Sequence, residues 1–304
     1  MTRFYCNLFA LKSLPFYTAT MHTRTIAILS LALCLKSMAH EFPGHTALDR
    51  EHRISLGTEL YAGQRGYWHA GAGVSVPLGD QFTAEIGTHL VREETGAKNV
   101  PSFELELLGE FGGGLEIEAF GFGYTRVGRK QAWGAGLRAT KWFAFRDGFS
   151  VAPFFGPAYA RVRAEEASGE IATVHHTMLL AGVTLEAGPV SVTLLGSHSL
   201  YNRPTAGLET PVDLESMTHF AAYENNDGFA RTTFAAEAAC AVTSRLTLHA
   251  RYAAMQFAGE TRHALALTPA CKLGERVELT AGIQLLRGGA VENDLVFSGL
   301  SVSF

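Results

Sequence analysis

Apolar and polar residues alternate one by one through most of the chain after residue 52. The clearest case is the final segment, 294–304, in which Val296, Leu300, Val302 and Phe304 share one set of alternate positions. The other set in this segment is mostly small or polar. Successive side chains of a β-strand point to opposite faces, so a period of two predicts strands with one apolar face. Segments of about 10–14 residues with this period recur along the chain and favour an all-β fold.

These segments predict about fourteen strands, with twelve to sixteen compatible with the pattern. The predicted bounds are 52–62, 67–77, 82–92, 102–111, 115–127, 132–143, 149–163, 170–186, 189–201, 230–242, 246–257, 262–272, 276–287 and 294–304. The connections alternate between tight turns, such as 78–81 and 112–114, and segments of varying length, of which 202–229 is much the longest. Tight turns on one rim and variable loops on the other are typical of an antiparallel barrel that spans a membrane.

The first 39 residues predict a leader with a secretory signal peptide. They contain no acidic residue, and a basic start after Met21 is followed by an apolar run, 26–35, and by the small residues Ser37 and Ala39. The run is shorter than the roughly 20 residues that a transmembrane helix needs, and no later run is long enough either. We therefore expect a short periplasmic arm at 40–51 and a barrel over 52–304, because a mature chain in the membrane would need a closed barrel.

The charge argues against a nucleic-acid-binding protein, and the cysteine content argues against a disulfide-stabilised scaffold. All acidic residues lie after the leader, so the exported part is more acidic than the whole-chain charge of −4, which argues against a nucleic-acid partner. The mature part holds two cysteines, Cys240 and Cys271, on predicted strands that are separated by one other strand. Their backbones should then be about 9–10 Å apart. A disulfide tolerates at most about 7 Å, so we predict free thiols.

These features together resemble bacterial outer-membrane β-barrels of the monomeric porin type. The resemblance rests on architecture over the whole mature chain and not on a family-specific motif. It implies a single transmembrane antiparallel barrel in the bacterial outer membrane, in contact with outer-membrane lipid, that needs no cofactor. It also implies that the barrel assembly machinery reads the terminal aromatic residue, Phe304, and that small hydrophilic solutes diffuse through the lumen. Aromatic residues near the strand ends fit two membrane interfaces, with Phe82, Phe111, Trp142 and Phe149 on the tight-turn rim and Tyr61, Tyr67, Trp68, Trp133 and Tyr159 on the loop rim.

The polar positions of the strands carry the candidate pore-lining residues. Carboxylates occupy the third to fifth strands, namely Glu85, Glu104, Glu106, Glu110, Glu116 and Glu118. Basic residues gather on the eleventh to thirteenth strands with one further glutamate, namely His249, Arg251, Arg262, Lys272, Arg276 and Glu278. In a closed ring of fourteen strands these two groups lie on opposite walls. Two interpretations stay open: a hydrated wall with charges paired to their neighbours, or a transverse field across an aqueous pore with weak cation preference.

The long connection 202–229 is acidic. Its candidate mouth-loop residues are Glu209, Asp213, Glu215, Glu224 and Asp227. A loop of this length is usually functional or disordered. It either constricts the pore mouth or forms a mobile loop at the cell surface, and the sequence favours neither.

The remaining short motifs indicate neither an enzyme active site nor a metal-binding site. Gly134–Ala139 has the spacing of a dinucleotide-binding turn but lies inside an alternating strand, without the helix that such a motif requires. The neighbours His175 and His176 point to opposite faces of a strand, as do Ser197 and His198, so neither pair forms a two-residue site. We expect no catalytic residue. The alternatives to a pore are a non-conducting structural or adhesive barrel and, less favoured, a lipid-modifying outer-membrane enzyme.

Overall fold

The computed structural model describes residues 53–92, 99–127, 130–145, 148–166, 168–209, 229–288 and 293–304. Fourteen long strands make up nearly all of it: β1 Ser55–Ala62, β2 Trp68–Pro77, β3 Phe82–Arg92, β4 Val100–Phe111, β5 Leu115–Val127, β6 Lys130–Lys141, β8 Phe149–Glu166, β9 Ile171–Ala187, β10 Val190–Tyr201, β12 Thr232–Thr243, β13 Leu246–Gln256, β14 Thr261–Lys272, β15 Val277–Arg287 and β16 Asn293–Ser303. Two strands of two residues, β7 Phe143–Ala144 and β11 Leu208–Glu209, and a short 3-10 helix, η1 Gln64–Gly66, complete the described elements. The predicted leader and arm lie outside these residues.

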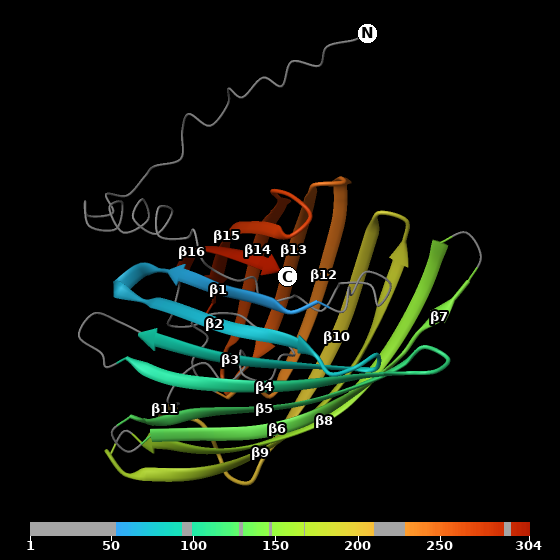
Figure 1. Cartoon of the computed structure of the whole chain (residues 1–304). Helices are drawn as coiled ribbons and strands as arrows, with labels where there is room; N and C mark the ends of the chain where they lie inside the picture. Colours follow the sequence, from blue (N-terminus) through green and yellow to red (C-terminus); the bar gives the residue numbers. More distant parts are fainter. Residues whose placement is uncertain are drawn as a thin grey trace.

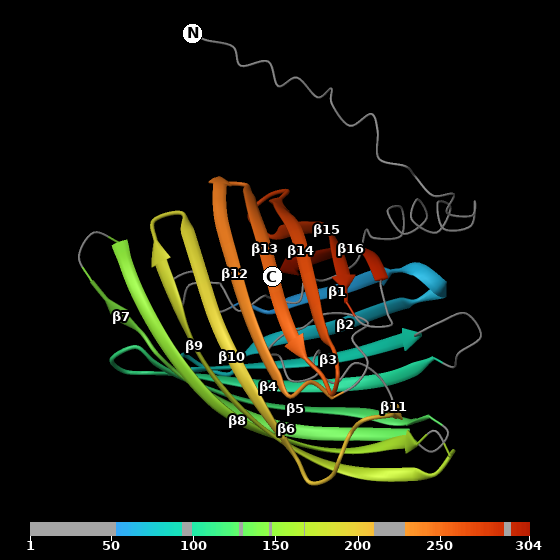
Figure 2. The ribbon, with the colours of Figure 1, turned by 180° about the vertical axis from the view of Figure 1, so that it is seen from behind.

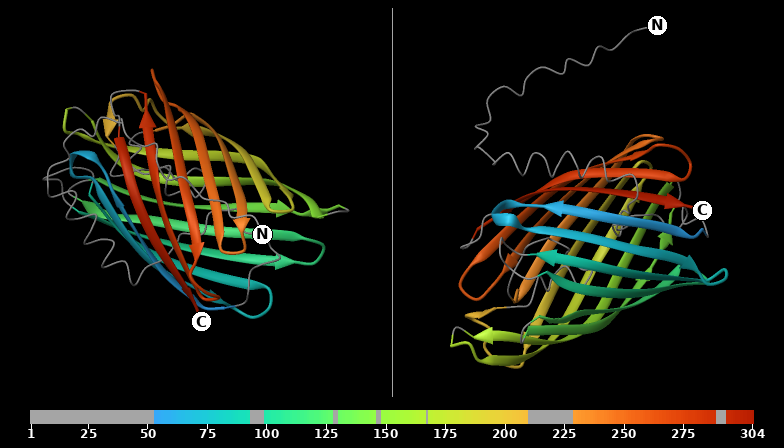
Figure 3. Two further views of the ribbon diagram at one scale, coloured as in Figure 1. Left: turned by 90° about the horizontal axis from the view of Figure 1, so that it is seen from above. Right: turned by 60° about the vertical axis from the view of Figure 1, so that its left-hand side comes forward.

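The long strands form one closed antiparallel ring. Each pairs with its sequence neighbours, and the ring closes where β1 pairs with β16 from Ser55 opposite Ser303 to Ala62 opposite Val296. Figures 1 and 2 show the two sides of this ring, with the first and last strands next to each other. Seen from above, strands on opposite sides cross at a steep angle, because closing a sheet requires its strands to tilt (Figure 3). The predicted fourteen-stranded barrel is confirmed.

The predicted strand bounds differ from the structure mainly at the rims. The strand predicted to reach residue 143 ends at Lys141, and the chain then forms β7, which pairs with Ser150 and Val151 at the start of β8. On the other rim β8 continues to Glu166, where β11 pairs with it. The described residues contain no helix long and apolar enough to cross a membrane.

The outer face of the ring is apolar. Large exposed side chains occur at alternate positions around it, including Leu56, Ile86, Phe103, Leu105, Leu107, Ile117, Leu137, Phe155, Leu179, Leu194, Phe234, Leu248, Leu265, Leu267, Ile283 and Val296. A soluble monomer rarely exposes so continuous an apolar surface, whereas a lipid-facing band requires one. Outward-facing aromatic pairs lie near both rims, with Phe82 edge-on to Phe111 at 5.9 Å and Trp133 to Tyr159 at 6.0 Å between ring centroids.

Two aromatic residues assigned to the loop-rim interface face inward instead. Tyr67 is buried in an interior apolar cluster, and Tyr61 packs against the same cluster. Tyr61 stacks on His69 and on Phe297 from the two strands beside β1. The assignment failed because it placed aromatic residues by their distance from a turn and ignored the side of the sheet to which each points.

The prediction for the cysteines is confirmed. Cys240 lies on β12 and Cys271 on β14, with β13 between them, and both thiols are free.

Closure between β1 and β16 predicts a specific cross-link. In a mature chain with Cys240 and Cys271 changed to serine, Leu60→Cys with Ser298→Cys should form a disulfide, because residues 60 and 298 are direct partners. Directly opposite Cα atoms lie about 4.5–5.5 Å apart, within disulfide range. Leu60→Cys with Leu300→Cys is the control, since a pair offset by two residues is about 7–8 Å apart. Peptide mass mapping of the folded protein measures both, and equal yields would contradict the closure.

Candidate functional site: the inward face of the barrel

Burial separates the inward from the outward positions of each strand. On β8 the buried Ala158, Ala160 and Val162 alternate with the exposed Phe155 and Tyr159. On β4 the glutamates alternate in the same way with the exposed Phe103, Leu105 and Leu107. The inward positions therefore form a continuous interior surface, which is the candidate functional site.

The six predicted carboxylates share this inward face on three adjacent strands. Glu85 on β3 is directly opposite Glu106 on β4, and Glu110 on β4 is directly opposite Glu116 on β5. Like charges at directly opposite positions repel each other and weaken strand pairing. Their concentration gives this wall a negative potential, which water or a cation in the interior reduces.

One of these carboxylates is already neutralised within the wall. Glu118 on β5 is buried, with 2% of its surface exposed, and forms an ion pair with Arg138 on β6. The two residues are direct partners in the β5–β6 register. Arg138 was missed as a candidate, although it occupies an inward-facing position of β6, two and four residues after the inward-facing Gly136 and Gly134.

The basic residues are on the opposite wall and are also paired with neighbours. In the ring order β4 lies opposite β13, as expected. Arg251 on β13 forms an ion pair with Glu237 on β12, and Arg262 on β14 bonds Glu260 at 2.6 Å and lies over the ring of Phe257. These contacts favour the interpretation of charges paired with their neighbours and weaken a transverse field.

The remaining predicted residues of this wall sit nearer the tight turns. Lys272 and Arg276 are exposed at the ends of the β14–β15 turn, and Glu278 is half-buried just inside it. His249 and Arg251 line a small cavity with Ser191, Thr193 and Thr268. The tight-turn half of the interior is thus polar.

Much of the loop-side half of the interior is apolar, which the sequence analysis did not predict. Two clusters of buried inward-facing side chains lie there: Tyr67, Val91, Val100, Phe122, Tyr124, Val162, Val174 and Leu295 belong to the first, and Phe120, Met178, Leu180, Leu195, Met255, Phe257 and Leu286 to the second. Met255 and Leu286 have no exposed surface. The polar face expected on nearly every strand therefore covers only part of the barrel's depth.

The described ends of the long connection pack against this apolar part. Thr205 is buried, Leu208 packs on the first cluster, and Phe229 belongs to it. Arg203 bonds Glu166 at the end of β8, at 2.9 Å. The backbone of Glu209 lies in β11, whereas Asp213, Glu215, Glu224 and Asp227 lie outside the described residues, so their role at the mouth stays a prediction.

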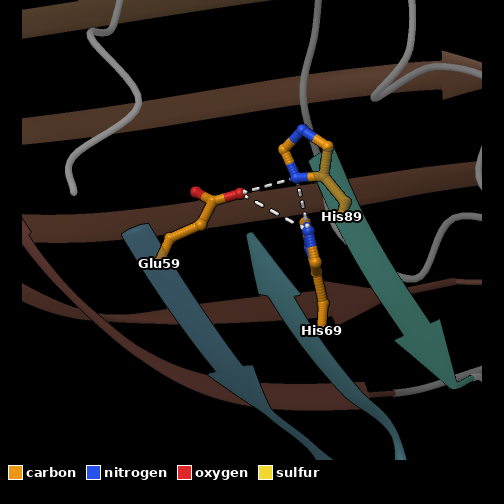
Figure 4. Close-up of side chains that lie close together, drawn as sticks. All are labelled: Glu59, His69 and His89. Atoms are coloured by element: carbon orange, nitrogen blue, oxygen red, sulfur yellow. Dashed lines mark hydrogen bonds and ion pairs between the residues drawn. The ribbon is translucent and has the colours of Figure 1, made fainter. Parts of the chain in front are cut away.

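A cluster that the sequence analysis overlooked lies on the first three strands. Glu59 on β1, His69 on β2 and His89 on β3 all point inward and converge (Figure 4). Each occupies one of the alternate positions of its strand that point inward, so the alternation of side chains alone places all three on the inner face. Their mutual proximity depends on register, which the alternating pattern does not report.

The neighbouring histidine and serine motifs split between the two faces, as predicted. His176 is buried inside and bonds Ser199 at 2.9 Å, whereas His175 is exposed outside and bonds Tyr159. Ser197 is buried, while the outward His198 bonds Thr232 at 3.2 Å. Neither Ser197 with His198 nor the two histidines can therefore act on one substrate.

Comparison with known proteins bears on the fold alone. No protein-family model matches the chain, and no curated protein is detectably similar in sequence. Among solved structures the chain is similar to the CymD monoaromatic hydrocarbon channel, at 10% identity with a TM-score of 0.51, over 84% of this chain and 89% of that one. It is also similar to the KdgM porin in complex with disordered oligogalacturonate (10% identity, TM-score 0.42, 82% and 99% covered) and to Pseudomonas aeruginosa OprD (9%, 0.46, 88% and 99%). The fold is that of porin-type outer-membrane barrels, which confirms the resemblance inferred from the sequence.

The buried pair Glu118–Arg138 predicts an asymmetric mutational response. Arg138→Met should destabilise the barrel by about 3–5 kcal/mol, because it leaves a buried carboxylate without its partner. The double variant Glu118→Gln with Arg138→Met should recover most of that loss. Arg287→Met is the control, since its ion pair with Asp294 is nearly half exposed and should contribute under about 1 kcal/mol. Urea unfolding in detergent measures all three, and equal losses for Arg138→Met and the double variant would contradict the prediction.

Proposed function

We propose that the chain forms a passive outer-membrane pore with weak cation preference for small hydrophilic solutes. The observation that carries this proposal is the gathering of six inward-facing carboxylates on the three adjacent strands β3–β5. A ring of fourteen strands is wide enough to enclose water, since about eight strands only just fill themselves with side chains. Export by the signal peptide, recognition of Phe304 by the assembly machinery and a monomeric state belong to the same proposal.

The charge pattern supports a preference that is weak. Arg251, Arg262 and Arg138 each form an ion pair with a nearby glutamate, which reduces the contribution of these basic residues to the interior field. Fields in a water-filled lumen are screened over about 8–10 Å at physiological salt. Cations should therefore be enriched modestly, and more strongly at low salt.

The exposed ring of Phe304 is compatible with recognition by an assembly factor. Its backbone N–H bonds the carbonyl of Ile54 at 2.9 Å, which ties the end of the chain to the first strand. The side chain is 62% exposed at the tight-turn rim. An aromatic residue whose backbone is held by the first strand and whose ring is exposed is accessible to a partner protein.

The apolar loop-side clusters favour one alternative function. Buried inward side chains such as Met255 and Leu286 reduce the space for water, so the barrel is either a narrow pore or a non-conducting structural or adhesive protein. We favour the narrow pore, because a barrel that carries no solute has no need for opposed glutamate pairs that weaken its own sheet.

Planar-bilayer recording separates these two functions. Purified protein should insert into the bilayer and give discrete current steps. Each step should be smaller than the current expected through a fourteen-stranded barrel whose lumen holds no inward-facing bulky side chains. Heat-denatured protein at the same detergent concentration is the control. Inserted and folded protein, verified by its heat-dependent gel mobility, that gives no current steps would identify a non-conducting barrel.

Selectivity tests the role of the carboxylates. Replacing Glu106 and Glu116 with glutamine should move the reversal potential in a salt gradient toward zero, with the larger effect at low salt. Glu165→Gln is the control, because this residue occupies an outward-facing position of β8; it removes one carboxylate charge, whereas the double variant removes two. A reversal potential that is unchanged in the double variant, or a wild type that prefers anions, would show that these glutamates do not line the conducting path.

A further inference from the structure

Three potential metal-ligand atoms meet on the inward face of β1–β3. His69 Nε2 lies 3.0 Å from His89 Nδ1, and Glu59 Oε1 lies 3.5 Å from each of these nitrogens (Figure 4). The three side chains come from three adjacent strands and are largely shielded, with 8–14% of their surface exposed. Two imidazoles and a carboxylate are a donor set that suits Zn²⁺ and related divalent ions.

The backbone is built to let these atoms approach. Glu59, Gly71 and His89 occupy one row of the sheet, since Gly71 is the direct partner of both other residues. A Cβ on Gly71 would lie 2.7 Å from His89 Nδ1 and 2.9 Å from Glu59 Oε1. The glycine therefore leaves the space in which the two side chains reach toward each other from either side.

Neighbouring groups hold the ligands in place. The second ring nitrogen of His89, Nε2, forms an ion pair with Glu104 Oε1 at 3.0 Å. The hydroxyl of Tyr61 donates to Glu59 Oε2 at 3.3 Å, and its ring stacks on His69. A carboxylate on the far nitrogen of a histidine is the usual support of a metal-binding imidazole, because it fixes the ring orientation and raises the basicity of the ligating nitrogen.

The dimensions match a tetrahedral ion. With Zn–N and Zn–O bonds of about 2.0–2.2 Å, tetrahedral donors lie about 3.3–3.5 Å apart. The observed triangle of 3.0, 3.5 and 3.5 Å fits three of the four positions and leaves one for water or a solute group.

We propose that Glu59, His69 and His89 form a Zn²⁺-binding site on the lumen wall, supported by Glu104 and Tyr61. The site stands on its own geometry and does not depend on whether the barrel conducts. The competing interpretation is a metal-free network in which one histidine donates a hydrogen bond to the other.

The direct test is Zn²⁺ titration of folded, detergent-purified mature protein without a histidine tag, by isothermal calorimetry after chelator treatment. The wild type should bind one ion per chain. His69→Gln and His89→Gln should each weaken binding at least tenfold, whereas His175→Gln, an exposed histidine of the outer face, should not. Heat-dependent gel mobility verifies that each variant is folded. A folded wild type that binds no Zn²⁺, or binding that is equal in all three variants, would overturn the proposal in favour of the metal-free network.

Two further measurements separate coordination from nonspecific binding. Gly71→Ala should weaken Zn²⁺ binding by crowding two ligands, while Gly196→Ala, whose new methyl would meet nothing closer than 3.9 Å, should leave it unchanged.

Co²⁺ in place of Zn²⁺ should give the visible absorption of a four- or five-coordinate ion, and His89→Gln should remove it. Absence of that absorption in Co²⁺-loaded wild type would contradict the site even if ions bind elsewhere. Because none of these readouts uses current, their failure and the failure of the pore proposal are distinguishable.

Discussion

The rest of the structure depends on the pairing of β1 with β16. In the hydrocarbon region of a membrane no water is present to bond a free N–H or C=O group, so a sheet with open edges carries a penalty at every residue. The eight direct partners between Ser55–Ala62 and Val296–Ser303 remove both edges at once. Closure then forces one face of every strand outward, and this is why the chain tolerates exposed residues such as Phe103 and Leu105.

Closure also creates an interior whose character changes along its depth. β5 shows the change within one strand, because Glu116 and Glu118 are followed at the same parity by Phe120, Phe122 and Tyr124. The glutamates join the carboxylate wall, and the aromatic residues join the two buried clusters. A solute that entered the interior would therefore meet a charged zone and a more apolar zone in series.

The sequence alone was sufficient for the strands, their number and the face of most side chains, because these depend on a local period of two. It was insufficient for contacts between strands. Arg138 meets Glu118, and His69 meets His89, only through the register of neighbouring strands and the space left by Gly71. The apolar half of the interior was missed for a different reason. On β9 both Met178 and Leu179 are apolar, and a strand with two apolar faces shows no alternation to interpret.

The cluster of Glu59, His69 and His89 lies where the two interior zones meet, and this location has an electrostatic consequence. His69 shares its row with Val91 and Val100 of the apolar cluster, whereas Glu104 beside His89 belongs to the carboxylate wall. Apolar neighbours exclude water and strengthen charge interactions on that side. A divalent ion bound there would neutralise Glu59 and leave a net positive charge next to Glu104, so it would oppose the negative potential of the wall. The carboxylate wall on β3–β5 and the cluster on β1–β3 share strand β3. Together they would set both the sign of the interior field and its dependence on a bound metal.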